Sequence, residues 1–226
     1  YGSSVYEGNN ASHSLNVSST ASAITGLVDW PAYVGEPYIV AGGISFDVGE
    51  CTGPTPLHVR RQVGDGPEEQ RADITTDEVC SFRFTDTVAT SGGVRYTVSW
   101  DGDGTHQPAS TDIFGWVDKQ PATLTADAAD YYLRPGQRVE ITGTLAGART
   151  GPLAGQQVNV TRWNPDGNAT VLGPVTTSRT GTFVLRDAPP RVDPYLSFRY
   201  ELTWVPADDT YDPATTEVTV YVTPSG

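Results

Sequence analysis

Side chains that could carry acid–base or nucleophilic chemistry are few in this sequence. Nucleophilic hydrolysis needs a Ser or Cys beside a base, and only His13, His58 and His106 could serve as that base. No Gly-x-Ser-x-Gly elbow and no phosphate-binding Gly-x-x-x-x-Gly-Lys loop is present. The 27 acidic residues leave glycosidase chemistry open, but that chemistry also needs a deep cleft. We expect that the chain is not an enzyme.

Metal-binding patterns are also sparse. Neither His-Glu-x-x-His nor paired cysteines, which zinc sites use, occur in the chain. Carboxylates gather in two turns that follow a Trp, and calcium prefers oxygen ligands; the candidates are Asp101, Asp103, Asp208, Asp209 and Asp212. Tight turns, however, select Asp for backbone reasons alone. We expect no cofactor, with calcium in these turns as the alternative.

Two cysteines, Cys51 and Cys80, complete the inventory of reactive side chains. One disulfide is the simplest interpretation, and two buried free thiols are the alternative. A disulfide favours an oxidising, extracellular setting. In the chain-entropy model it would stabilise the fold by roughly 3 to 4 kcal/mol.

Aromatic side chains are the remaining candidates for ligand binding. Trp30, Tyr33 and Tyr38 are close in the sequence, and Trp163 stands beside a turn. A row of exposed rings could stack on sugars. The alternative, which we favour, is that these rings pack at the seam between neighbouring modules.

Charge and composition exclude several classes of protein. The chain of 226 residues has a net charge of −13, so it repels nucleic acid, and we expect no nucleic-acid partner. Its 24 Gly and 17 Pro residues are typical of a turn-rich, all-β protein. No apolar run approaches the roughly 18 to 20 residues of a membrane span. Among the basic residues only Lys119 is a lysine, and this arginine bias indicates a high-GC bacterial genome.

An internal repeat organises the chain and indicates gene duplication. The offset is 101 residues for 35–42 with 136–143, 57–61 with 158–162 and 79–86 with 180–187, and it is 104 residues for 96–100 with 200–204. Each repeat contains about seven short strands of period-2 alternation, which place Trp100 and Trp204 in the core. The pattern predicts two tandem β-sandwiches.

The start of the chain continues this pattern upstream. The 11 residues that separate His106 from Val117 also separate Tyr6 from Val17. The absence of Met leads us to expect a segment of a longer, exported protein. We predict three parts, namely 1–20 as the last strand of a preceding repeat, 21–118 as a first domain and 119–226 as a second.

Two pairs of segments resemble a known family. Residues 99–110 and their partner 203–214 resemble the ending of bacterial Ig-like repeats, where Pro-Ala-Ser precedes the last strand. Residues 152–160, which begin Pro-Leu-Ala-Gly, together with 176–183 are similar to the prealbumin-like variant of these modules. The resemblance implies two seven-stranded Ig-like β-sandwiches, preceded by an orphan terminal strand. Such modules serve as stalks, spacers, adhesins and enzyme appendages alike.

The resemblance and the composition together favour a non-catalytic extracellular structural module. We expect a stalk, surface fibre or adhesin segment, secreted or at the cell surface of a high-GC bacterium. The linker 118–122 spans at most about 17 Å, which predicts a semi-rigid rod. The expected partners are neighbouring Ig-like repeats or identical copies, to which residues 5–18 would donate a strand; polysaccharide and cell-surface protein also stay open. The alternative is a carbohydrate-binding or accessory module appended to a secreted hydrolase or toxin.

Overall fold

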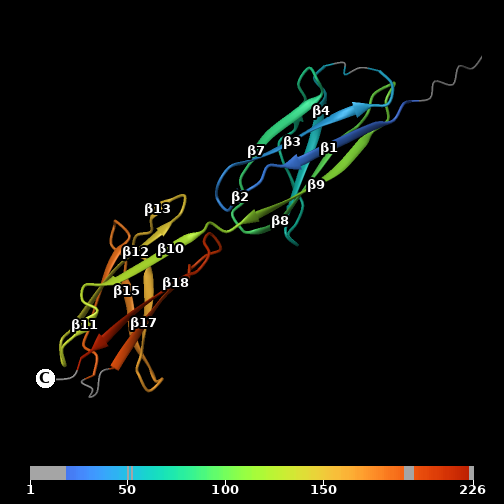
Figure 1. The fold of residues 1–226 in the computed structure, drawn as a ribbon. Coiled ribbons are helices and arrows are strands. Elements are labelled where there is room, and N and C mark those ends of the chain that lie inside the picture. Colours follow the sequence, from blue (N-terminus) through green and yellow to red (C-terminus); the bar gives the residue numbers. More distant parts are fainter. Residues whose placement is uncertain (1–18, 50, 52, 191–195, 224–226) are drawn as a thin grey trace, which may run out of the picture. The chain divides into compact units, whose positions relative to one another are not determined.

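The computed structural model describes residues 19–49, 51, 53–190 and 196–223, and in these ranges it contains strands and no helix (Figure 1). The predicted all-β fold is confirmed. The strands of the first repeat are β1 (Ser22–Val28), β2 (Ala32–Tyr33), β3 (Tyr38–Phe46), β4 (Pro56–Val63), β5 (Glu69–Gln70), β6 (Ile74–Thr75), β7 (Ser81–Asp86), β8 (Gly92–Trp100) and β9 (Ala109–Asp118). The strands of the second are β10 (Ala122–Ala128), β11 (Tyr132–Leu133), β12 (Val139–Gly147), β13 (Gly151–Pro152), β14 (Gln157–Trp163), β15 (Ala169–Thr176), β16 (Thr182–Asp187), β17 (Leu196–Trp204) and β18 (Ala214–Val222).

Each repeat contributes two sheets. In the first repeat the strand orders are β1-β3-β7 and β2-β9-β8-β4-β5, with β6 also paired to β4. In the second repeat they are β10-β12-β13, with β16 also paired to β12, and β11-β18-β17-β14-β15. Strands β10, β12 and β16 therefore take the places of β1, β3 and β7. The duplication seen in the sequence extends to the strand topology.

The chain divides into two compact units. One contains the described residues up to Val28 together with Val40–Phe84 and Arg95–Phe114, and the other contains Asp29–Ile39, Thr85–Val94 and the described residues from Gly115 onward. The domain boundaries expected from the sequence, at residues 20 and 118, stay a prediction.

The second strand of each repeat is short and runs parallel to the last strand of that repeat. Ala32 pairs with Val117 between β2 and β9, and Leu133 pairs with Val222 between β11 and β18. Pairs of adjacent long strands, such as β10 with β12 and β17 with β18, are antiparallel. Each repeat thus joins its beginning to its end through a parallel contact.

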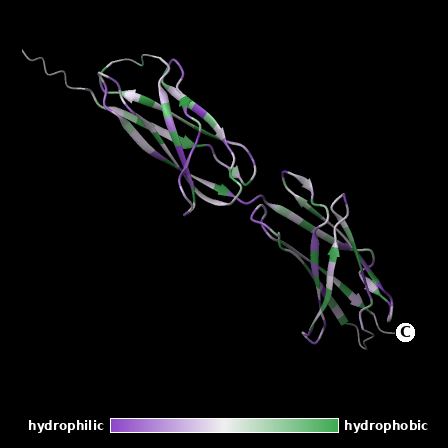
Figure 2. Ribbon diagram, turned by 180° about the vertical axis from the view of Figure 1, so that it is seen from behind, coloured by the Kyte–Doolittle hydropathy of each residue, from purple (hydrophilic) through white to green (hydrophobic). Residues whose placement is uncertain are grey.

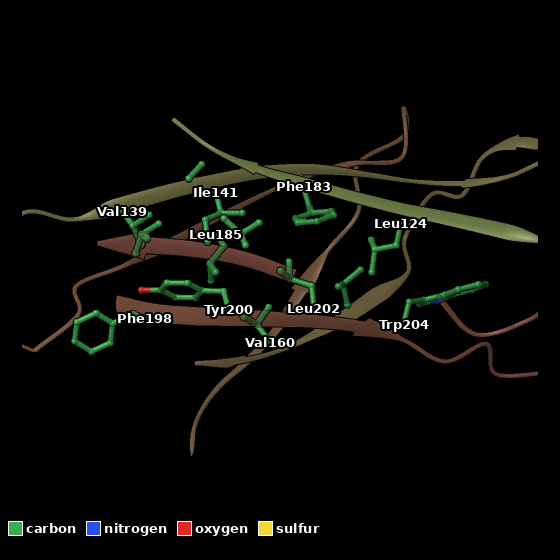
Figure 3. Close-up of a cluster of buried hydrophobic side chains, with 14 of the residues drawn as sticks. Leu124, Val139, Ile141, Val160, Phe183, Leu185, Phe198, Tyr200, Leu202 and Trp204 are labelled. Atoms are coloured by element: carbon green, nitrogen blue, oxygen red, sulfur yellow. The ribbon is translucent and has the colours of Figure 1, made fainter. Parts of the chain in front are cut away.

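The core of the second repeat lies between its two sheets. Hydrophobic and hydrophilic residues alternate along the strands (Figure 2), as period-2 geometry requires. On β17 the inward face carries Tyr200, Leu202 and Trp204, which meet Phe183 and Leu124 from the facing sheet (Figure 3). The expectation that Trp100 and Trp204 lie in the core is confirmed, because both side chains are buried.

A glycine facing a phenylalanine recurs in the core of both repeats. A Cβ atom added to Gly143 would lie 2.2 Å from Cζ of Phe183, and one added to Gly42 would lie 2.5 Å from Cζ of Phe82. Any side chain at either glycine would therefore displace a buried ring. The match at an offset of 101 residues reflects this shared packing.

Candidate functional site

The first acidic turn is built around Asp103. Its Oδ1 accepts hydrogen bonds from Thr105 N–H at 2.7 Å, Thr105 Oγ1 at 2.8 Å and His106 N–H at 2.8 Å. The Thr105 backbone bond, followed by the His106 side chain, holds the pKa of Asp103 well below its usual range. The His106 ring packs 4.6 Å from the Phe46 ring. Asp103 thus caps a turn that anchors an inward-facing aromatic position.

In the second acidic turn, Asp208 caps the turn and Asp209 contacts residues outside it. Asp208 accepts from Thr210 N–H at 3.0 Å, and this bond lowers the pKa of Asp208. Asp209 contacts Lys119 Nζ at 2.8 Å and accepts from Ser91 N–H and Oγ at 2.7 Å each. Lys119, followed by Ser91, lowers the pKa of Asp209 to about 2. These carboxylates bind protein donors of the same compact unit.

Neither acidic turn, as far as the structure describes it, forms a calcium ligand set. Asp101 pairs instead with His58, and the Asp212 N–H donates to the Gln120 carbonyl at 3.0 Å. In the part of the chain that the structure describes, no group of three His, Cys, Asp or Glu residues could hold a metal ion. Calcium takes about 6 to 8 oxygen ligands. Turn capping accounts for Asp103 and Asp208, whereas Asp101 and Asp209 contact residues outside their turns.

His58 lies between two carboxylates. Its Nδ1 is 3.1 Å from Asp73 Oδ1 and its Nε2 is 3.3 Å from Asp101 Oδ2. The Asp73 hydrogen bond, the largest cause, raises the pKa of His58 above its usual value. Both ring nitrogens are therefore engaged by carboxylates in this structure. His13 lies outside the described residues.

An open hollow of about 530 Å³ surrounds this histidine. Its lining mixes positive, negative and neutral polar side chains, namely His58, Arg60, Gln70, Arg71, Asp73, Ser99 and Asp101. The hollow contains no aromatic ring on which a sugar could stack. Within the lining, His58 contacts Asp73 and Asp101, and Arg60 pairs with Glu68 outside it at 3.4 Å.

The aromatic candidates occupy different environments. Trp30 is 73% exposed, Tyr33 is half-buried in β2, and Tyr38 is only 5% exposed and belongs to the core. Trp163 is half-buried, with the Arg199 guanidinium 5.2 Å from its ring centroid and Glu201 Oε2 3.3 Å from its Nε1. The three rings of the first repeat therefore do not form one exposed row, because Tyr38 points inward.

Two exposed aromatic residues were missed by the sequence analysis. Phe114 is 71% exposed and Trp116 is 58% exposed, and both lie on the outward face of β9. The signal was available, because the buried neighbours Ile113 and Val117 fix which side of the strand faces out.

A buried polar cluster in the second repeat was also missed. Asp187 Oδ2 accepts from Arg162 Nη1 at 2.6 Å and from Tyr200 Oη at 2.8 Å. Only 8% of the Arg162 side chain and 15% of the Asp187 side chain are exposed. Burial, followed by Asp187, raises the pKa of Tyr200. The first repeat carries Arg, Asp and Tyr at the aligned positions, and this repetition was the overlooked signal.

The predicted disulfide between Cys51 and Cys80 is confirmed, with Cα atoms 5.7 Å apart. Cys80 has a left-handed backbone, with φ of 60°, and is 2% exposed. Its N–H donates to Asp77 C=O at 3.1 Å, which closes the turn before β7. The bond joins this turn to the segment that follows β3.

No family model matches the chain, and no curated protein matches it in sequence. Structural neighbours include a tetra-tandem repeat in the extending region of a large adhesion protein, at 15% identity and a TM-score of 0.39, covering 90% of this chain and 49% of that one. Trypsin-activated alpha-2-macroglobulin from Escherichia coli has 15% identity and a TM-score of 0.39, covering 93% and 16%. The Yersinia pseudotuberculosis adhesin InvE has 14% identity and a TM-score of 0.36, covering 87% and 58%. This chain spans less than two thirds of each neighbour, and at these TM-scores the likeness carries no argument about function.

Proposed function

We propose that the chain is a non-catalytic spacer in an extracellular stalk, surface fibre or adhesin, and that its work is to carry tension. The observation that carries this proposal is the parallel pairing of β2 with β9 and of β11 with β18. The disulfide supports an extracellular setting, and the net charge of −13 supports a surface that repels other copies.

The parallel pairs matter because of the direction of the load. Pulling the ends of a repeat apart draws the two partners of its parallel pair, β2 and β9 or β11 and β18, in opposite directions along their length. The hydrogen bonds between them are then stretched together rather than one after another. In the second repeat these bonds run from Tyr221 N–H to Tyr131 C=O at 2.7 Å and from Thr223 N–H to Leu133 C=O at 2.9 Å.

A second parallel contact lies where each repeat begins. Gln120 N–H donates to Thr210 C=O at 2.8 Å, and Asp212 N–H donates to Gln120 C=O at 3.0 Å. The first repeat has the same arrangement, in which Thr20 bridges Thr105 and Gln107 at 3.0 and 2.8 Å. The two repeats differ in sequence here but use the same pair of backbone hydrogen bonds to hold the residue that precedes their first strand. This similarity supports a shared mechanical role.

Single-molecule pulling on the whole chain tests this function. We expect one abrupt unfolding step for each repeat. Thr223→Pro removes the N–H that bonds Leu133 and lies just beyond β18, so it should lower the unfolding force of the second repeat. The first repeat in the same molecule is the control and should be unchanged. Gradual extension without steps would contradict the proposal.

A carbohydrate-binding module is the second candidate function, favoured by the exposed rings of Trp30, Phe114 and Trp116. Aromatic faces of this kind stack on sugars. Retention of the chain on insoluble cellulose, chitin or starch, lost in Trp116→Ala and kept in Trp163→Ala, would support this candidate. Absence of retention on all three would remove it.

Assembly by strand donation also stays a proposal, because residues 5–18 lie outside the described residues. A donated strand would pair with the exposed edge of a sheet in another copy. Light scattering of the purified chain at high concentration should then show species larger than a monomer. A monomer at every concentration would count against homopolymer formation.

A further inference from the structure

We propose that the Cys51–Cys80 disulfide limits how far the first repeat can be stretched, because it keeps the residues between the two cysteines out of the path of tension. This inference rests on the tension-bearing function proposed above. The second repeat lacks the device, since Pro152 and Gly181 stand at the positions aligned with the cysteines.

The bond closes a loop that contains β4, β5 and β6. Force applied to the ends of the chain crosses from Cys51 to Cys80 through the sulfur atoms, so the enclosed residues carry none of it. The loop also holds its own contacts, because β4 pairs with both β5 and β6 and Thr76 N–H donates to Thr55 C=O at 3.0 Å. Extension of the chain outside the loop does not pull these contacts apart.

The turn itself does not need the bond. Gly181 closes the same turn in the second repeat with φ of 71° and no sulfur, whereas Cys80 adopts φ of 60°. A residue with a Cβ is disfavoured in this left-handed region, so the first repeat holds a cysteine where the backbone prefers glycine. Such an outlier directs attention to a role beyond the local fold.

The length that the bond withholds follows from its position in the chain. The two cysteines are 29 residues apart in sequence, and their Cα atoms are 5.7 Å apart. A stretched chain spans at most about 3.3 to 3.6 Å per residue, so opening the bond releases about 95 Å. Cys80 is 2% exposed and Cys51 is half-buried, so unfolding of the first repeat increases the access of a reductant to the bond.

Force-clamp pulling on the whole chain, with and without dithiothreitol, tests the proposal. In reduction, a thiolate of the dithiol attacks one sulfur, the S–S bond breaks, and two electrons and two protons pass from the dithiol to the cysteines while it closes to a cyclic disulfide. With the reductant, we expect a step of about 95 Å after the first repeat has unfolded. Without it, that step should be absent.

Two results would overturn the proposal that the disulfide limits the extension of the first repeat. One is full extension of the chain to the same length with and without the reductant. The other is an extra step that precedes unfolding. If instead the repeats extend without abrupt steps, the tension-bearing function fails, while the difference in full length still reports on the disulfide. Failure of the two proposals is therefore distinguishable.

The second repeat offers a matched control. A Cβ added to Gly181 would lie 3.2 Å from Pro152 Cβ, close to the roughly 3.5 to 4.5 Å of disulfides, and the two positions are also 29 residues apart. Pro152→Cys with Gly181→Cys should give the second repeat its own reductant-dependent step of about 95 Å. The reverse variant, Cys51→Ser with Cys80→Gly, should abolish the reductant-dependent step of the first repeat. Should either variant fail to fold, the unmodified chain with and without reductant still decides.

Discussion

In the second repeat the turn that leads into β16 is closed by Gly181, and in the first repeat the matching turn before β7 is closed by Cys80. The two residues make the same bonds: Gly181 N–H donates to Ser178 C=O at 3.0 Å and its carbonyl accepts from Leu145 N–H at 2.9 Å. For Cys80 the corresponding distances, to Asp77 and Ile44, are 3.1 and 3.0 Å. The fold therefore fixes the geometry of the turn.

The choice of residue in that turn follows other demands. A left-handed backbone costs a residue with a Cβ about 1 to 2 kcal/mol, and the second repeat avoids this cost with glycine. The first repeat accepts the cost and gains a covalent link. By contrast, Arg162, Asp187 and Tyr200 have chemically identical counterparts in the first repeat. The comparison separates residue types that recur in both repeats from a disulfide that only the first repeat has.

Loss of the Cys51–Cys80 disulfide should have the largest effect on stability. Cys51→Ser with Cys80→Ser should lower the free energy of unfolding of the first repeat by roughly 3 to 4 kcal/mol, because the unfolded chain gains loop entropy. Urea unfolding followed by hydrogen exchange, with peptides from each repeat, measures this. The second repeat should keep its stability. Cys51→Ser with Cys80→Gly should lose about 1 kcal/mol less, and equal losses would show that the φ of Cys80 carries no strain.

Loss of the polar cluster in the second repeat should have the next largest effect. Arg162→Ala leaves Asp187 without its ionic partner in a mostly buried site, which should cost the second repeat about 3 kcal/mol. Tyr200→Phe removes one hydrogen bond and should cost about 1 kcal/mol. Thermal unfolding monitored by Trp fluorescence checks both. Arg61 stands at the aligned position of the first repeat and pairs with Glu69 at 2.7 Å. We expect Arg61→Ala to destabilise the first repeat as Arg162→Ala destabilises the second, and a neutral result would show that the two arginines differ in role.

Gly181→Ala should have a smaller effect of about 2 kcal/mol. The added Cβ meets the Leu145 carbonyl oxygen at 2.5 Å and also occupies a left-handed backbone. Gly155→Ala is the matched control, because Gly155 has φ of 69° but open space around its Cβ position. Equal losses in the two variants, measured by urea unfolding, would show that the contact with Leu145 relaxes freely.

Much of the fold followed from the sequence because its signals are periodic. Alternation identifies the long strands, and the offset of 101 residues aligns Cys80 with Gly181. The parallel strands β2 and β11 were beyond reach, because each has only two residues and two residues show no period. These short strands nevertheless carry the proposed mechanical function.

The candidate site was harder to predict because one residue type can serve two purposes. Asp103 and Asp209 have the chemistry of calcium ligands, yet their oxygens accept hydrogen bonds from turn and loop residues. Tyr38 resembles its neighbour Tyr33 in sequence, but the pleat of β3 turns it into the core. Only three-dimensional pairing distinguishes a ligand from a cap, or an exposed ring from a buried one.

The smallest expected effect concerns pH and also separates the repeats. His58 bonds Asp73 and Asp101, and these contacts raise its pKa in the folded chain, whereas the aligned residue of the second repeat, Asn159, does not titrate. The stability that His58 adds is therefore complete below its unfolded pKa of about 6.5. It is lost as the pH rises through the higher folded pKa.

An NMR titration of the His58 ring measures this shift directly. The pKa should lie above 6.5 in the unmodified chain and fall markedly in Asp73→Asn, since Asp73 is the largest cause of the shift. Asp101→Asn should lower it less, because that carboxylate contributes less. The pH dependence that His58 gives the first repeat should then become smaller in Asp73→Asn, while the second repeat stays unaffected. A larger fall in Asp101→Asn would reverse the assignment of the dominant partner.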